Sequence, residues 1–274
     1  MELPKGRIRP RVGRLPYLFA LPFTAHWEGA DRFELITAPP RQLGHLTRHD
    51  ELDAACVPVL EARSLSRRYE PLGNLGFAAV GPVPVAVLAA RLEIELLGNA
   101  AVGVSDQGAT AVAALEVLLS HAYRVREPNI VPLSPDRFDL GAVLLVGDDA
   151  IEASRSPSAP FVHPYDLAGE WRNWTGGPLP LCRWIVRKSL PDEQKEELEA
   201  LVRRSVTEVL KNPGPLLESH IVEHGLSCSV LDAEAWLRSC TYELGPAEER
   251  AGQHLYELHR ELHRKVTSWR DLLG

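Results

Sequence analysis

In the middle of the chain, residues 83–90 read Val83-Pro84-Val85-Ala86-Val87-Leu88-Ala89-Ala90, an apolar run without a charged side chain. Two further runs of this kind follow, at 100–104 and at 141–146. Such runs are typical of strands that are covered on both faces. Between them, Ala111 to His121 is rich in alanine and leucine and predicts a helix. Strands that alternate with helices predict an α/β fold.

The same alternation continues outward from this centre. Toward the N-terminus, strands are expected at 11–15, 33–36, 51–58 and 70–80, the last with a turn at 73–74, and helices at 41–49 and 59–65. Toward the C-terminus, helices are expected at 166–175, 192–210, 216–224, 233–240 and 246–273, after a Ser- and Pro-containing loop at 151–165. The last third is therefore predicted to be mostly helical.

Composition narrows the class of protein. Of the 274 residues, 45% are hydrophobic and 24% are charged, which is typical of a soluble globular chain. The net charge of −7 argues against nucleic acid as a partner, because nucleic-acid binders usually carry a basic excess. The start has no apolar signal-peptide segment, and no apolar run is long enough to span a bilayer. The four scattered cysteines indicate reduced thiols in a cytoplasmic protein.

Three turns that follow predicted strands are candidate ligand sites, because ligands of α/β sheets bind beyond the carboxyl ends of the strands. They span residues 16–22, 105–110 and 147–149. The turn Ser105-Asp106-Gln107-Gly108-Ala109-Thr110 opens a helix and suits an anion such as a carboxylate, although ordinary helix capping explains the same residues. Asp148 presents a carboxylate for acid–base work or hydroxyl recognition, with an N-cap as the simpler interpretation.

Two histidine pairs have helical spacing, His220 with His224 and His259 with His263. Such pairs are able to hold a metal, but no third ligand stands at a telling spacing, so solvated helix faces are the preferred interpretation. The chain also lacks a Walker loop, a G-x-G-x-x-G motif and a G-x-S-x-G motif. We therefore expect neither a metal nor an organic cofactor. From the residues alone, an enzyme and a binding protein both stay open.

Several motifs resemble the chorismate dehydratase family of the futalosine route to menaquinone. They are Arg9-Pro10-Arg11-Val12-Gly13 with Tyr17-Leu18 and Leu21-Pro22, Leu52-Asp53-Ala54-Ala55-Cys56-Val57-Pro58, Gly81-Pro82-Val83, the segment 142–150, Asp166-Leu167, and Glu170-Trp171-Arg172-Asn173-Trp174-Thr175-Gly176 with Pro178 and Trp184. These motifs keep the family's order and spacing over roughly residues 9–187. The helical remainder fits the family in length.

The resemblance implies a type-2 periplasmic-binding-protein fold with two lobes around a central cleft. The first lobe would be discontinuous, comprising residues 1–90 and 186–274, and the second would span 91–185. It also implies the dehydration of chorismate to 3-[(1-carboxyvinyl)oxy]benzoate, without a cofactor, by a cytoplasmic protein. The partner is then a small-molecule carboxylate, and neither a membrane nor nucleic acid is expected.

The resemblance also nominates the site. Phe19 stands where the family has an asparagine, and Val85 stands where it has a serine. In the helix-opening turn, the family's Ser-Arg-Thr-Ser reads Gly108-Ala109-Thr110-Ala111, so its arginine is absent. The expected catalytic positions are Phe19 and Asp148, and the expected substrate-binding residues are Tyr17, Val85, Ser105, Asp106, Gln107, Gly108, Ala109 and Thr110.

Two alternatives accompany this interpretation. One is a related enzyme of the same pathway that shares the fold. The other is a non-catalytic cytoplasmic binder of an aromatic or apolar carboxylate, which the apolar replacements Phe19, Val85, Ala109 and Ala111 favour. Arg14, Arg91 and Arg183 are the arginines that we considered as replacements for the missing cation.

Overall fold

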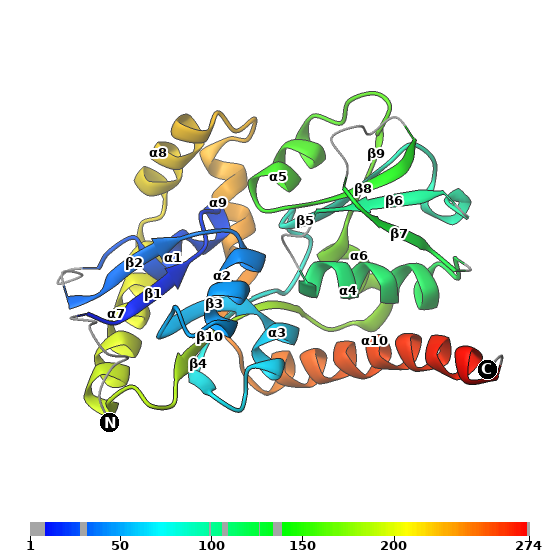
Figure 1. Ribbon diagram of the computed structural model, residues 1–274. Coiled ribbons are helices and arrows are strands. Elements are labelled where there is room, and N and C mark those ends of the chain that lie inside the picture. Colours follow the sequence, from blue (N-terminus) through cyan, green and yellow to red (C-terminus); the bar gives the residue numbers. More distant parts are fainter. Residues whose placement is uncertain are drawn as a thin grey trace.

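Two β-sheets, each covered by helices, make up the computed structural model (Figure 1), which describes residues 9–27, 32–98, 100–105, 109–125, 127–133 and 139–272. The first sheet has the strand order β11-β4-β10-β3-β1-β2. Its strands are β1 (Arg11–Arg14), β2 (Glu34–Thr37), β3 (Ala54–Pro58), β4 (Tyr69–Ala79), β10 (Leu179–Arg187) and β11 (Cys240–Glu243). β1 pairs in parallel with β2 and β3, whereas β10 runs antiparallel to β3 and β4.

The second sheet has the strand order β7-β6-β8-β5-β9. Its strands are β5 (Ala86–Ala90), β6 (Ala101–Val104), β7 (Asn129–Pro132), β8 (Leu140–Val146) and β9 (His163–Asp166). β6 pairs in parallel with β7 and β8, and β5 is antiparallel to β8 and β9. All five residues of β5 are buried, as the apolar run at its position predicts.

The helices lie against the two sheets and between them. They are η1 (Leu18–Ala20), α1 (Leu21–Thr24), α2 (Pro40–Arg48), α3 (Val59–Ser64), η3 (Ile94–Leu96), α4 (Ala109–Val117), η4 (Leu118–Ala122), α5 (Asp148–Arg155), α6 (Leu167–Thr175), α7 (Asp192–Lys211), α8 (Gly214–His224), α9 (Val230–Arg238) and α10 (Pro246–Leu272). Figure 1 shows α10 as one long helix that starts beside the first sheet and runs beneath α4 of the second. None of the described helices is both long and apolar enough to cross a membrane.

Most of the expected helices and strands are present, and the differences concern a few segments. The predicted loop at 151–165 is wrong at both ends, because α5 continues to Arg155 and β9 begins at His163. No turn breaks the strand at Gly73; the chain continues through β4, and Gly73 adopts a φ of +55° within it. The strands β7, β10 and β11 were not predicted.

The tryptophans divide between the core and the surface. Trp171 and Trp184 are fully buried, whereas the side chain of Trp174 is 38% exposed and stacks against His121. The indole N–H of Trp171 donates to the carbonyl of Pro178 at 3.0 Å. Trp171 and Trp184 therefore pack in the core, whereas Trp174 lies partly at the surface.

Strand membership moves the proposed lobe boundaries. The boundary expected at 90 falls at the end of β5, which belongs to the second sheet, and the boundary expected at 185 falls inside β10, which belongs to the first. We propose that the two sheets are the two lobes and that the chain crosses between residues 79 and 86 and returns between 166 and 179. The antiparallel pairing of β5 with β8 and of β10 with β3 supports this proposal.

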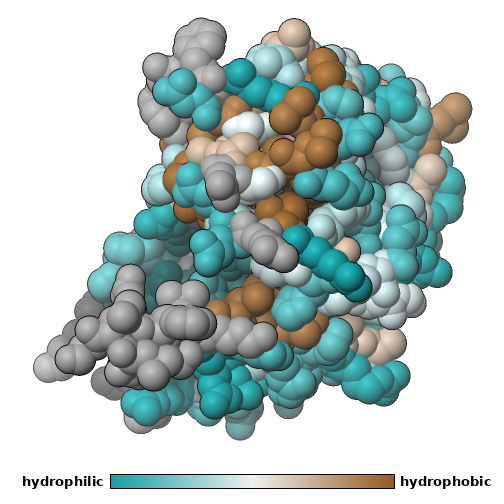
Figure 2. Space-filling view, turned by 90° about the vertical axis from the view of Figure 1, so that its right-hand side faces the viewer, coloured by the Kyte–Doolittle hydropathy of each residue, from teal (hydrophilic) through white to brown (hydrophobic). Residues whose placement is uncertain are grey.

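Figure 2 looks onto the end of the molecule that carries the second sheet. Apolar side chains gather on the upper part of that face, with polar ones around them. Exposed large apolar residues of the segment that forms the second sheet are Leu92, Leu96 and Val162.

Candidate functional site

A partly open cavity between the two sheets is the candidate site. It lies where β1, β3 and β8 end and where α4 begins, so it is bounded by the turns that the strand order brings together. Its lining residues are Leu15, Tyr17, Phe19, Ala20, Phe23, Pro40, Pro58, Phe77, Val85, Ala86, Thr110, Ala111, Val146, Gly147, Leu181 and Cys182. Both sheets contribute to this lining, which is almost entirely apolar.

Tyr17 follows β1 and provides one of the few polar groups in the cavity wall. Its ring packs against Gly147, where an added Cβ would lie 2.4 Å from the nearest ring carbon. Burial, and then the charges of Asp149 and Asp148, raise the pKa of the Tyr17 hydroxyl well above its ordinary value. The hydroxyl therefore keeps its proton at neutral pH.

Phe19 and Val85 also line the cavity. Phe19 is 2% exposed and packs against Phe77 and Trp236, with ring centroids 6.1 and 6.2 Å away. Its carbonyl accepts the hydroxyl hydrogen of Tyr242 at 2.9 Å. The aromatic ring at this position is thus part of the core of the first sheet as well as of the cavity wall, and it offers no acid or base.

The predicted anion-binding turn is divided between two sites. Thr110 lines the cavity, and its hydroxyl accepts the Leu60 N–H at 3.4 Å. Ser105 and Ala109 instead line a separate groove that also contains Arg41 and Arg48. The predictions for Asp106, Gln107 and Gly108 lie outside the described residues.

Asp148 does not line the cavity; its carboxylate connects three elements instead. One oxygen accepts the Leu18 N–H at 2.9 Å, and the other lies 2.8 Å from Nε2 of His220 on α8. Asp148 also stands in the first turn of α5, where a negative charge is favourable. The simpler interpretation of Asp148 as a structural residue at a helix start fits these contacts better than a role in acid–base chemistry.

No arginine or lysine belongs to the described residues that line the cavity. Arg14 donates to the Thr37 hydroxyl at 2.8 Å, and Arg183 forms an ion pair with Glu249. The guanidinium of Arg91 lies over the ring of Phe161, 5.4 Å from its centre. Besides the hydroxyls of Tyr17 and Thr110, the cavity offers the Cys182 thiol and the first backbone N–H groups of α4, which have no partner within the helix.

A carboxylate lies beside the pair His259 and His263 and beside the pair His220 and His224. Glu116 of α4 lies beside His259 and His263, and Asp148 lies beside His220 and His224. In each group, the potential ligand atoms all lie within 4.8 Å of one another. The third members stand far from the pairs in sequence, so spacing alone had no means of finding them.

Comparisons with known proteins show the family that this chain matches and the solved structures that it resembles. The chain matches the family described as menaquinone biosynthesis over residues 10–261. A search of curated proteins finds no match. Among solved structures, protein AF1704 of Archaeoglobus fulgidus is 19% identical with a TM-score of 0.74, covering 93% of this chain and 98% of its own.

Two sulfonate-binding proteins share the same fold. The alkanesulfonate-binding protein SsuA of Xanthomonas axonopodis pv. citri, bound to MOPS, is 12% identical with a TM-score of 0.65, covering 94% of this chain and 95% of its own. The periplasmic aliphatic sulphonate-binding protein SsuA of Escherichia coli is 9% identical with a TM-score of 0.62, covering 96% of this chain and 94% of its own. The architecture is thus that of the periplasmic binding proteins, as the sequence motifs predict.

Proposed function

Because the chain belongs to the menaquinone biosynthesis family, we propose that it is a cytoplasmic chorismate dehydratase whose site is the cavity between the two sheets. In this reaction, the ring carbon that bears the enolpyruvyl ether loses a proton and the neighbouring carbon loses its hydroxyl group. Water leaves, the ring becomes aromatic, and 3-[(1-carboxyvinyl)oxy]benzoate is formed. Aromatisation supplies the driving force, so the protein has to position the substrate and help the hydroxyl leave.

The observation that carries this proposal is the partly open apolar cavity at the ends of β1, β3 and β8, to which both sheets contribute. Walls of this kind exclude water from the reacting ring and strengthen the few polar contacts inside. The hydroxyls of Tyr17 and Thr110 are the side-chain groups placed to donate hydrogen bonds to a substrate.

The described residues that line the cavity include no carboxylate or histidine, which agrees with one hypothesis about the base. The substrate's own enolpyruvyl carboxylate takes the ring proton, so no side chain of the protein has to do so. A chorismate analogue without that carboxylate tests this hypothesis. It should bind without being dehydrated, and undiminished turnover of the analogue would rule the hypothesis out.

A second candidate function is a non-catalytic binder of an aromatic or apolar carboxylate. It is favoured by the same lining, because the described residues in it include no arginine or lysine to neutralise the two carboxylates of chorismate. Phe19 and Val85 add to this apolar character, because each stands where the family has a hydrogen-bonding side chain. Each such group lost costs about 2–4 kcal/mol of transition-state stabilisation when nothing replaces it.

The test is to incubate the purified protein with chorismate and to quantify substrate and product by chromatography with mass detection. Product above the uncatalysed rate supports the dehydratase, and its absence with folded protein excludes it. Alkylation of Cys182, followed by mass analysis of the peptide that contains it, then tests binding separately, because this half-buried cysteine belongs to the cavity lining. If chorismate slows alkylation of Cys182 without being converted, the binder is the better account.

A further inference from the structure

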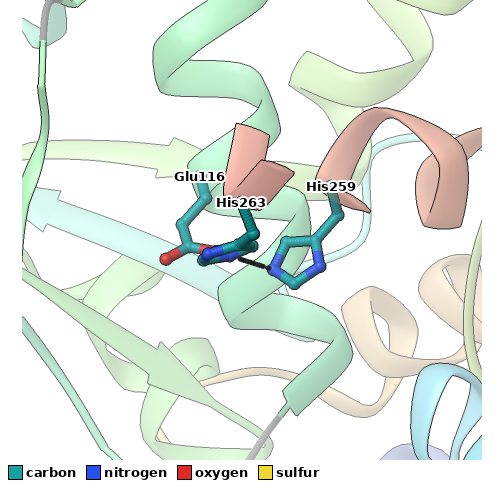
Figure 3. Close-up of side chains that lie close together, drawn as sticks. All are labelled: Glu116, His259 and His263. Atoms are coloured by element: carbon teal, nitrogen blue, oxygen red, sulfur yellow. Dashed lines mark hydrogen bonds and ion pairs between the residues drawn. The ribbon is translucent and has the colours of Figure 1, made fainter. Parts of the chain in front are cut away.

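A group of three side chains away from the cavity connects the C-terminal helix to the second sheet. Figure 3 shows Glu116 on α4 and His259 and His263, one turn apart on α10, with their polar ends converging. Nε2 of His259 and Nε2 of His263 lie 2.8 and 3.3 Å from the same oxygen of Glu116. The two Nε2 atoms are 3.0 Å from each other.

Hydrogen bonds leave this triangle of atoms crowded. If both Nε2 atoms carry a proton, each donates to the same Glu116 oxygen, and two positively polarised N–H groups lie 3.0 Å apart. If one of them lacks its proton, its lone pair points at the carboxylate oxygen. A cation at the centre would instead accept a lone pair from each of the three atoms at once.

The spacing of the three atoms also fits a tetrahedral metal ion. With a metal–nitrogen distance of about 2.0–2.1 Å, ligand atoms of a tetrahedral zinc site lie about 3.3 Å apart. The observed separations are 2.8, 3.0 and 3.3 Å, so small shifts of the side chains open the group to an ion. Two histidines and one glutamate are a known zinc ligand set, with water as the fourth ligand.

The surroundings suit a metal that enters from solvent. The His263 side chain is 58% exposed, whereas that of Glu116 is 19% exposed.

We propose that Glu116, His259 and His263 form a zinc site that fastens α10 to α4. The consequence reaches the cavity, because α4 begins at Ala109 and its residues Thr110 and Ala111 line the cavity wall. α10 itself starts against β10 of the first sheet. A bound ion thus links the two sheets through their helices, a property independent of the reaction proposed for the cavity.

The chain contains two other histidine pairs with the same spacing, and they serve as controls. His220 and His224 also have a carboxylate nearby, but Asp148 accepts the Leu18 N–H through one oxygen and contacts His220 through the other. In the proposed site, both histidines instead converge on one oxygen of Glu116. The rings of His45 and His49 stack 4.2 Å apart, and this pair belongs to neither of the two metal-ligand groups found among the described residues. Spacing alone is therefore not sufficient for a site, and the glutamate distinguishes the proposed one.

In the experiment, chelator-treated protein is titrated with Zn²⁺ and the heat of binding is measured by calorimetry. A second titration with Co²⁺ follows visible absorption, which is intense for a tetrahedral site and weak for an octahedral one. Wild-type protein should bind the metal, and His263→Ala and Glu116→Gln should each weaken binding at least about tenfold. His224→Ala and His49→Ala should leave the affinity unchanged. Zn²⁺ should also raise the melting temperature of the wild type but not that of His263→Ala.

Because His263 is exposed, its replacement should leave the metal-free melting temperature unchanged, which separates loss of a ligand from loss of the fold. Two results would overturn the proposal. One is that wild-type protein does not bind Zn²⁺ or Co²⁺. The other is that binding survives in both His263→Ala and Glu116→Gln, or is lost in His224→Ala, which would place the metal elsewhere.

Discussion

Gly147 is the residue at which the second sheet meets the loop after β1. It has a φ of +66° and a ψ of −135°, a region that is essentially open to glycine only. The Tyr17 ring occupies the space that a side chain at this position would need. Gly147 therefore fixes both the turn between β8 and α5 and the position of Tyr17 in the cavity wall.

Gly147→Ala should lower the free energy of unfolding by at least about 2 kcal/mol, because backbone strain and the clash with Tyr17 add. Gly176→Ala is the matched control: it also has a positive φ, of +74°, but nothing lies within 4 Å of its added Cβ. That variant should lose about 1 kcal/mol, from the backbone alone. Urea denaturation measures both, and equal losses would show that contact with Tyr17 has no energetic weight.

At the scale of elements, α6 shows how a sequence motif becomes local structure. Asp166 precedes the helix, and its carboxylate accepts the Ala168 N–H at 2.9 Å, while Gly176 ends the helix in the left-handed conformation. The signature at 170–176 thus lies on a capped helix whose buried face carries Trp171. Burial raises the pKa of the Asp166 carboxyl to about 7, although N–H groups of Ala168, Gly169 and Val83 lower it.

This raised pKa predicts the sign of a pH dependence. Between about pH 4 and about pH 7, the native state holds a proton on Asp166 that the unfolded chain has lost, so stability falls as the pH rises through this window. Asp166→Asn keeps an acceptor for the cap but does not titrate. Its stability relative to the wild type should therefore increase with pH, by at most about 1.4 kcal/mol per pH unit. A difference that stays constant from pH 4 to pH 8 would contradict this account.

The elements that the sequence failed to reveal share a physical cause. In β10, Pro180, Cys182 and Arg183 interrupt the apolar residues at irregular intervals, so the sequence shows neither a continuous apolar run nor a period of two. The register of β10 against β4 is also irregular. β7 is an edge strand of four residues without a buried one. By contrast, β5 and β8 are covered on both faces, and their apolar runs made them predictable.

At the scale of the whole molecule, the site combines residues that are far apart in the sequence. Tyr17, Phe19, Val85 and Thr110 were predicted as site residues through their motifs, and they do line one cavity. The cavity's other walls, such as Phe77 and Leu181, were not predicted, because their position depends on how the two sheets face each other. The group of Glu116, His259 and His263 was not predicted for the same reason, because it joins two helices that are far apart in the sequence.

Asp148 also acts at this scale, because it joins α5 of the second sheet to η1 and α8. Asp148→Asn retains an acceptor for the Leu18 N–H but removes the charge beside His220, whose side chain is 7% exposed. It should lower the free energy of unfolding by about 1–2 kcal/mol. The control is Asp149→Asn, an exposed neighbour in the same first turn, which should change it little. If both variants lost the same free energy of unfolding, the loss would come from the interaction of a negative charge with the α5 dipole and not from the contacts of Asp148.

The central claim is that the cavity between the sheets converts chorismate, and one comparison tests it most directly. Ala111 is buried in the cavity wall on α4, so Ala111→Leu places its added carbon atoms in the empty space while keeping a good helix former. The measurement is the rate of formation of 3-[(1-carboxyvinyl)oxy]benzoate by the wild type and by this variant, both shown to be folded by circular dichroism. The account predicts product from the wild type and at least about tenfold less from Ala111→Leu. No product from the wild type, or equal rates from both proteins, would contradict it.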